Sequence, residues 1–234
     1  MSRKRKKSHP WRLRIAGLAF LAALVAGIWL WWDVNHWMPP EDIYRDQGVL
    51  AGAGDGAVNF RTIRAIGGSF AYLDASDGAG GQDARFTRNF AAAREAGLQV
   101  GAVHSFDPCV MADGQSANFV TMVPRDATLL PPVIELTRLA DSCKKRVSDA
   151  AVESELMTLI NQIENHAGKA AILKLDPAFE DRYGLAGQLE RNLWLTRTRL
   201  APDYAGRPWL LWTANEALRS EASEDPIRWV VVQP

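Results

Sequence analysis

The chain has 234 residues, of which 47% are hydrophobic and 23% charged, which is enough for one substantial globular domain with an appendage. The net charge of zero hides an asymmetry. The first 14 residues hold seven of the 27 basic residues and no acid, which leaves 20 basic against 27 acidic groups in the rest. This acidic balance argues against nucleic acid as a partner of the main domain.

The chain begins with the basic tail, residues 1–14, and continues with a run without charged residues, 15–32. At about 1.5 Å per helical residue this run spans about 27 Å, close to the hydrocarbon thickness of a bilayer. Four tryptophans lie near its far end, as in an interfacial aromatic belt: Trp29, Trp31, Trp32 and Trp37.

The positive-inside rule places the basic tail in the cytoplasm. We therefore predict a single-pass signal anchor over residues 15–32, a linker over residues 33–42, and a periplasmic or extracytoplasmic domain over residues 43–234. A cleaved signal peptide is the alternative. The apolar run leads into Trp-Leu-Trp-Trp-Asp, which lacks the small residues of a cleavage site.

Apolar runs, turn residues and helical periodicity predict the elements of the domain. Residues 70–73 and 98–103 read as buried strands, and a helix capped by Thr87 and ended by Gly97 joins them in a parallel βαβ unit. Further strands are expected at 48–50, 131–136, 170–175, 193–198, 209–213 and 229–232, and helices at 59–66, 115–123 and 148–166. About eight strands with fewer helices predict an irregular β/α barrel of the TIM-barrel type.

Short motifs occur in a fixed order along this domain. They are Phe70-Ala-Tyr-Leu, Ala75-Ser-Asp-Gly78, Asp83-x-Arg-Phe86, Asn89, Ala96-Gly-Leu98, Gly101-Ala-x-His104 and Leu130-Pro-Pro132. Together they resemble glycoside hydrolase family 25, the lysozymes that cleave peptidoglycan. The resemblance covers roughly residues 43–234, and it implies the family's irregular barrel and peptidoglycan glycan as the partner.

The departures from the family pattern fall where its chemistry is done. The first strand ends Gly48-Val-Leu50, where the family usually has Gly-x-Asp. The family's Asp-x-Glu is Glu135-Leu-Thr137 here, so a carboxylate remains at the first position and Thr137 replaces the expected proton donor. Asp77 is the shortened form of another family acid, and Arg228 falls near the place of a lost aspartate.

Glycosidic cleavage needs a carboxylic acid that protonates the leaving oxygen and a second carboxylate. A threonine hydroxyl is too weak an acid for the first task. The resemblance therefore implies a membrane-anchored, lysozyme-like protein that binds peptidoglycan glycan with lost or much reduced hydrolysis. Two alternatives stay open: an active muramidase that uses Glu135 with a second acid such as Asp77, and a scaffold or partner-binding module.

The catalytic candidates are thus Glu135 and Asp77. Further residues are candidates for lining the substrate cleft: Asp55, Asp74, His104, Phe106, Thr137 and Trp212. Turn roles for Asp55 and Asp77 and a structural role for His104 are the competing interpretations. Of Trp209, Trp212 and Trp229, at least two are expected in the core.

The two cysteines, Cys109 and Cys143, are too few for a disulfide framework. One disulfide between them is expected if the domain lies outside the cytoplasm, and two unpaired thiols are the alternative. The cysteines and histidines form no recognisable metal-binding pattern, so we expect neither a metal nor a cofactor.

Overall fold

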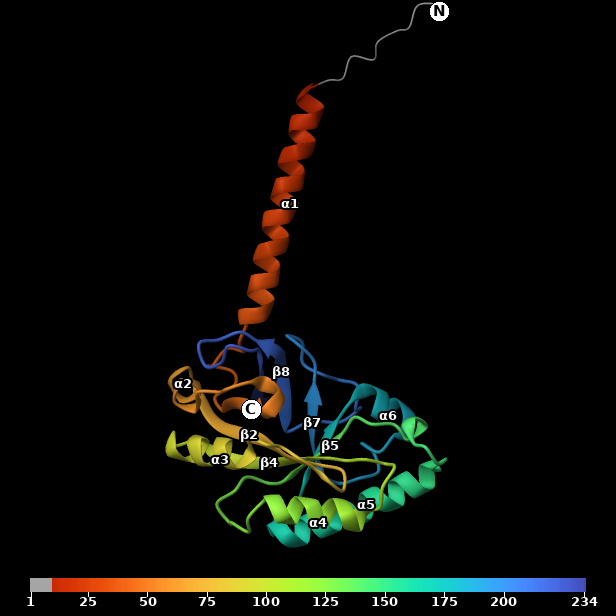
Figure 1. Ribbon diagram of the computed structural model, residues 1–234. Helices are drawn as coiled ribbons and strands as arrows, with labels where there is room; N and C mark the ends of the chain where they lie inside the picture. Colours follow the sequence, from red (N-terminus) through yellow and green to blue (C-terminus); the bar gives the residue numbers. More distant parts are fainter. Residues whose placement is uncertain (1–9) are drawn as a thin grey trace, which may run out of the picture. The chain divides into compact units, whose positions relative to one another are not determined.

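The computed structural model describes residues 10–234 and divides the chain after Trp37 into two compact units (Figure 1). The first unit is a single helix as far as it is described, α1 (Pro10–His36). Its apolar side chains are exposed, and the part from Arg14 to His36 is long and apolar enough to cross a membrane. A signal sequence near the N-terminus would pass the same test. Residues 1–9 of the predicted basic tail lie outside the described residues.

The second unit, Met38–Pro234, is built on a closed barrel of eight strands. Their order around the barrel is β1-β9-β8-β7-β6-β5-β4-β2, and β1 pairs with β2 to close it. The strands are β1 (Gln47–Ala51), β2 (Gly68–Asp77), β4 (Gln99–Ser105), β5 (Val133–Leu136), β6 (Ile172–Leu175), β7 (Asn192–Thr196), β8 (Leu211–Leu218) and β9 (Ile227–Val232). The predicted irregular barrel is confirmed.

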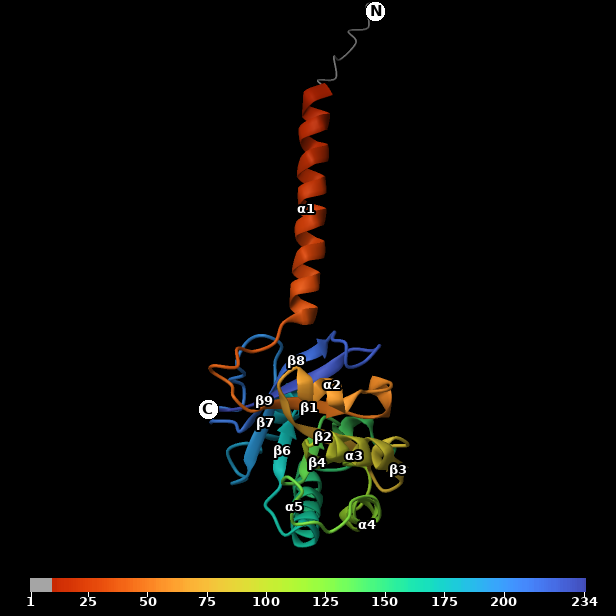
Figure 2. The ribbon, with the colours of Figure 1, turned by 90° about the vertical axis from the view of Figure 1, so that its left-hand side faces the viewer.

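The barrel departs from a regular parallel one at its last strand. β9 runs antiparallel to both β8 and β1, whereas the other neighbouring pairs of the barrel are parallel. Figure 2 shows β9 beside β1, although they come from opposite ends of the domain. A two-residue strand, β3 (Gly81–Gln82), extends the end of β2 as a hairpin.

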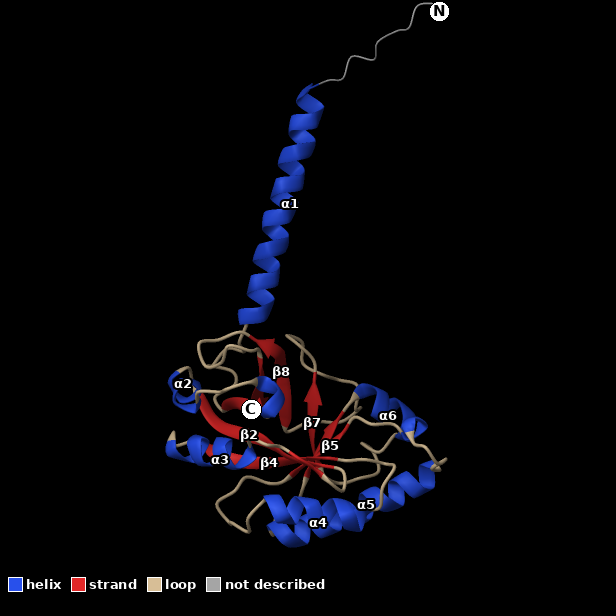
Figure 3. Cartoon of the chain, in the orientation of Figure 1, coloured by secondary structure: helices blue, strands red, loops and turns tan. Residues whose placement is uncertain are grey.

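The helices follow the earlier strands (Figure 3). They are α2 (Phe60–Ala65), α3 (Phe86–Glu95), α4 (Ala112–Met122), α5 (Asp149–Ala167) and α6 (Pro177–Tyr183), with 3-10 turns η1 (Ala53–Asp55) and η2 (Ala140–Ser142). The predicted cap of α3 was wrong, because the helix begins at Phe86 with Arg85 before it. The sequence reading missed α6, although Asp176 caps it and Pro177 opens it.

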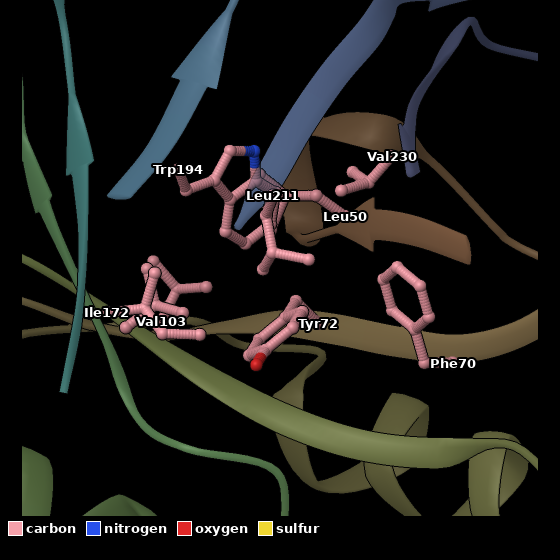
Figure 4. Packing of buried hydrophobic residues seen from close by; sticks show 9 residues of the cluster. Leu50, Phe70, Tyr72, Val103, Ile172, Trp194, Leu211 and Val230 are labelled. Carbon is pink, nitrogen blue, oxygen red and sulfur yellow. The ribbon is translucent and has the colours of Figure 1, made fainter. Parts of the chain in front are cut away.

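The barrel interior is filled by side chains (Figure 4). Each of the eight strands contributes to the cluster: Leu50, Phe70, Tyr72, Val103, Val133, Ile172, Trp194, Leu211 and Val230. Trp212 and Trp229 are also buried, as expected for at least two of the three C-terminal tryptophans. Because the interior is packed, a polymeric ligand can lie across an end of the barrel but cannot pass through it.

The segment before β1 packs on the barrel, which corrects the linker predicted over residues 33–42. The buried Gln47 amide donates to the carbonyls of Pro39 and Tyr44 at 3.0 and 2.8 Å, and its oxygen accepts from Trp229 Nε1 at 2.7 Å. Each polar atom of the buried Gln47 side chain therefore has a hydrogen-bond partner. These contacts place residues 38–42 with the barrel unit, while residues 33–36 belong to α1.

Candidate active site

Polar side chains form a layer at the carboxyl ends of the parallel strands. On four strands a polar residue follows an interior residue by two positions in the sequence. Side chains at this spacing on a strand point to the same face. Arg228 joins the layer from β9, where it pairs with Leu50 at the end of β1. We call this layer the mouth cluster: Asp55, Asp74, Ser105, Glu135, Lys174 and Arg228.

Glu135 is held by two neighbours from the adjacent strands. Lys174, its register partner on β6, forms a short ion pair with Glu135 Oε1. The Ser105 hydroxyl on β4 donates to Glu135 Oε2 at 2.8 Å. Burial alone would raise the pKa of Glu135, but the Lys174 ammonium and these hydrogen bonds outweigh burial and leave its pKa below the ordinary value. Glu135 is therefore an ionised, fully engaged carboxylate.

Arg228 bridges two other acids of the mouth cluster. Its Nη2 donates to Asp55 Oδ2 at 2.7 Å and to Asp74 Oδ2 at 2.8 Å. Burial would lower the pKa of Arg228, but the two carboxylates outweigh it and raise that pKa. For Asp74 burial is the largest effect and raises the pKa, although Arg228 opposes it. Arg228 thus stays charged, while burial favours the protonated form of Asp74.

The glycine-rich run at residues 51–56 serves this arrangement. The Gly52 N–H donates to Asp55 Oδ2 at 2.7 Å, and a side chain at Gly52 would collide with the Asp74 carboxylate. Gly52 has an extended backbone, so the need here is for close approach and not for a left-handed conformation. The glycine-rich run thus lets Asp55 and Asp74 come close enough together to share Arg228.

Asp77 lies apart from the mouth cluster, in a second set of charges. Arg138 forms a short ion pair with Asp77, and its Nη1 lies 3.5 Å from Asp107 Oδ2. The Asp77 side chain is half exposed. Thr137, at the predicted place of the proton donor, is exposed beside Arg138. The two predicted catalytic acids, Glu135 and Asp77, therefore each have a different cation as a partner.

Three predicted cleft residues are buried and do not line the mouth. His104, Phe106 and Trp212 are at most 3% exposed. Each directly follows an inward-facing neighbour, Val103, Ser105 or Leu211, so its side chain points out of the barrel. These assignments were wrong for that geometric reason.

His104 has a structural environment. Its Nδ1 lies 2.8 Å from Ser76 Oγ and its Nε2 lies 3.3 Å from Gln115 Oε1. Burial lowers the pKa of His104 to about 4, so the ring is neutral at pH 7. This is the structural role that the sequence left open for it.

The sequence reading missed Lys174 and Arg138 and gave Arg228 no partner. Lys174 left one signal, since it is a single charge in the middle of the apolar run at 170–175. A buried charge is costly unless it is paired, which points to an acid on a neighbouring strand. Arg228 stands likewise before the apolar residues Trp229 and Val230.

Cys109 and Cys143 are joined in a disulfide, with Cα atoms 5.2 Å apart. The bond ties the loop after β4 to the segment after β5, next to the mouth. Among residues 10–234 no group of three His, Cys, Asp or Glu side chains has a geometry that could hold a metal ion.

The irregular β/α barrel and the polar layer at the carboxyl ends of its strands define a β/α barrel whose candidate site lies at the usual face. The model of the glycosyl hydrolases family 25 matches residues 52–217, so the chain belongs to that family of lysozyme-like peptidoglycan hydrolases. The similarity covers most of the barrel, including all of the mouth cluster except Arg228.

Similar proteins agree with this assignment. A family 25 glycosyl hydrolase from Bacillus anthracis superposes with a TM-score of 0.75 at 25% identity, covering 86% of this chain and 93% of that one. The lysozyme from Streptomyces coelicolor gives a TM-score of 0.70 at 18% identity, over 81% and 92% of the two chains, and shows the shared fold.

Two sequence relatives match a smaller part of their own length. YegX of Escherichia coli K12 is 25% identical over 160 residues, which are 68% of this chain and 57% of YegX. Lysozyme M1 of Streptomyces globisporus is 30% identical over 101 residues, 42% of this chain and 34% of that lysozyme. The match thus spans about half of YegX and a third of the lysozyme.

Proposed function

We propose that this protein is a membrane-anchored member of family 25 that binds peptidoglycan glycan at the barrel mouth with lost or much reduced hydrolysis. The observation that carries the proposal is the pairing of mouth carboxylates with cations of the same chain. Lys174 neutralises Glu135, and Arg228 is shared by Asp55 and Asp74.

These cations oppose the chemistry of a glycosidase. Positive charge grows at the anomeric carbon in the transition state, and ionised carboxylates stabilise it. In this mouth the carboxylates already face the Lys174 ammonium and the Arg228 guanidinium. A developing oxocarbenium ion would meet two fixed positive charges, so the electrostatic stabilisation of the transition state is weakened.

The proton donor is compromised as well. Thr137 stands at the donor position that the family resemblance indicates, and its hydroxyl cannot serve near neutral pH. Glu135 has a lowered pKa and holds no proton to give. Loss of a general acid commonly removes about 10²–10⁴ in rate. The same charged and hydroxyl groups remain suited to hydrogen bonds with sugar hydroxyls.

The membrane part of the proposal rests on the first unit of the chain. The segment Arg14–His36 has the length and composition of a membrane span, and it follows a strongly basic tail. An anchor of this orientation holds the barrel on the outer side of the membrane, where peptidoglycan lies.

The experiment uses the full chain in a neutral detergent with purified peptidoglycan sacculi. We expect the protein to sediment with the sacculi while muropeptide release stays at least about 10²-fold below that of an active family 25 lysozyme. Glu135→Gln should leave this residual release unchanged. Release that Glu135→Gln abolishes would overturn the loss of hydrolysis, and protein that stays in the supernatant would favour the scaffold alternative.

A second candidate function is weak hydrolysis with Asp74 as the proton donor. The raised pKa of Asp74 and the lowered pKa of Glu135 favour it, because an acid and a base of a catalytic pair need such opposite shifts. The same assay separates the candidates. Under this mechanism both Asp74→Asn and Glu135→Gln should remove whatever release the wild type has, whereas binding without hydrolysis predicts no change in release for either.

A further inference from the structure

We propose that three consecutive cations at the edge of the mouth, Lys144, Lys145 and Arg146, form a docking site for anionic groups of the bound polymer. We call these three residues the cationic rim. The anionic groups are carboxylates or phosphates carried at intervals along a glycan strand. The inference rests on the proposed function, because it names what a polymer bound at the mouth should carry.

The cationic rim stands out in an acidic domain. Only four lysines follow residue 14 of the chain, and two of them are Lys144 and Lys145. All three side chains of the rim are exposed, and within residues 10–234 none forms a hydrogen bond or an ion pair with a carboxylate. Arg138 and Arg182, in contrast, already have acidic partners. The charge of the rim is thus available to a ligand.

The rim is held on a fixed segment. The disulfide of Cys143 with Cys109 lies directly before Lys144, and the Ala140 N–H donates to the Tyr183 hydroxyl at 2.9 Å. After the rim and Val147, Ser148 caps α5 by accepting from the Ala151 N–H at 3.3 Å. Because both ends of the segment are fixed, ordering it on a ligand costs less conformational entropy than ordering a free loop.

A hollow of about 450 Å³ lies beside the rim. Arg146, Arg182, Ser148 and Asp149 are among its lining residues, together with Asp141 and Cys143. Arg182 Nη1 donates to Asp149 Oδ2 at 2.9 Å, and its Nη2 lies 2.8 Å from Asp149 Oδ1, so these two charges largely cancel. Of the rim, Arg146 alone is among these lining residues, so within the hollow its charge is balanced by Asp141. Lys144 and Lys145, next to Arg146 in the chain, are exposed and make the balance of the segment positive. The start of the 19-residue helix α5 adds the partial positive charge of its N-terminus.

The position of the rim links it to the mouth. The rim lies on the segment that follows the carboxyl end of β5, and residues 139–143 separate it from Arg138. Loops that follow the carboxyl ends of barrel strands surround the same face. Figure 1 shows the start of α5 near α6, in agreement with the Arg182–Asp149 pair that joins them. A strand lying across the mouth can therefore place its anionic substituents on the rim.

The test compares two charge-matched triple variants of the full chain in a neutral detergent. The rim variant is Lys144→Gln/Lys145→Gln/Arg146→Gln. The control variant is Arg45→Gln/Arg61→Gln/Arg88→Gln, which removes three exposed cations before β1 and on α2 and α3. Binding is measured to peptidoglycan sacculi, to soluble polyglutamate as a carboxylate probe, and to soluble polyphosphate as a phosphate probe, at about 0.05 M and about 0.5 M salt.

The rim variant should bind sacculi about tenfold more weakly than the wild type at low salt, with a smaller effect of salt, and the control should match the wild type. The soluble probe that shows the larger loss identifies the anionic group. Equal loss in both variants, or no loss in the rim variant, overturns the inference while the proposed function stands. If the wild type fails to bind sacculi, the proposed function fails. The soluble probes then still decide whether the rim binds anions.

Discussion

At the scale of single residues, the main interaction of the mouth cluster is the ion pair between Glu135 and Lys174. They lie opposite each other on β5 and β6, and their side chains are only 15% and 11% exposed. A buried pair contributes little net stability compared with an apolar pair of the same size, but breaking it leaves a buried charge without a partner. The pair as a whole therefore adds little stability, but the loss of either residue alone is costly because the other is left buried and charged.

Lys174→Met should lower the free energy of unfolding by about 3 kcal/mol at pH 7, because Glu135 would then be a buried carboxylate without its ammonium. Urea unfolding followed by tryptophan fluorescence measures the loss. The folded-state pKa of Glu135 lies below its ordinary value. The pair therefore stabilises the fold fully at pH values above the ordinary pKa, and this contribution is lost as the pH falls through the folded-state pKa. In the variant the carboxyl takes up a proton more readily, so the deficit should shrink when unfolding is repeated near pH 4.

The matched control for this prediction is the double variant Lys174→Met/Glu135→Leu. It removes both charges, so it should recover most of the stability that the single variant loses. A single variant as stable as the wild type at pH 7 would contradict the buried ion pair.

At the scale of elements, the disulfide joins the loop after β4 to the segment after β5 and encloses a sequence separation of 34 residues. Cys109→Ser/Cys143→Ser should lower the free energy of unfolding by about 4 kcal/mol, mainly because the unfolded chain gains the freedom of that loop. Urea unfolding of the variant and of the wild type, each with and without reductant, measures the effect. The reductant should bring the wild type to the stability of the variant and leave the variant unchanged. Identical curves for all four samples would contradict a bonded pair.

Element positions followed from the sequence because apolar runs, Ser148 and Gly168 mark them locally, as in α5. Whether a side chain faces into the barrel or out of it did not follow from the sequence. β4 is buried on both faces from Val100 to His104, so its sequence has no polar and apolar alternation to tell inside from outside. His104 was assigned to the cleft because it follows the predicted end of this strand, and the sequence held no sign that its side chain faces outward.

The partners of the mouth acids were also beyond a local pattern. Glu135 meets Lys174 only because β5 and β6 pair in one register, and Arg228 reaches Asp55 only because β9 turns antiparallel beside β1. Register depends on the assembled sheet. The sequence could identify a carboxylate that survives from the family pattern, but the cations that neutralise it are set by the closed barrel.

At the scale of the whole molecule, the chain combines a barrel unit with an apolar helix. α1 has 27 residues, about 40 Å of helix, which exceeds the thickness of a bilayer core. Exposed apolar side chains along it, such as Leu18, Phe20 and Trp29, are suited to lipid. The competing interpretation, a cleaved signal peptide, needs small residues at the cleavage site, and Trp31 and Asp33 are not small.

With tags at both ends, the expressed full chain should remain one uncleaved species in the membrane fraction after alkaline extraction. The C-terminal tag should be open to protease from the outer side, and the N-terminal tag protected, because the positive-inside rule predicts that the basic tail stays in the cytoplasm. The matched control is Trp31→Ala/Asp33→Ala, which creates an Ala-Trp-Ala site and should release part of the barrel in soluble form. Loss of the N-terminal tag from the wild-type chain and of the barrel from the membrane would show that the apolar helix is a cleaved signal peptide. The barrel would then act as a released protein.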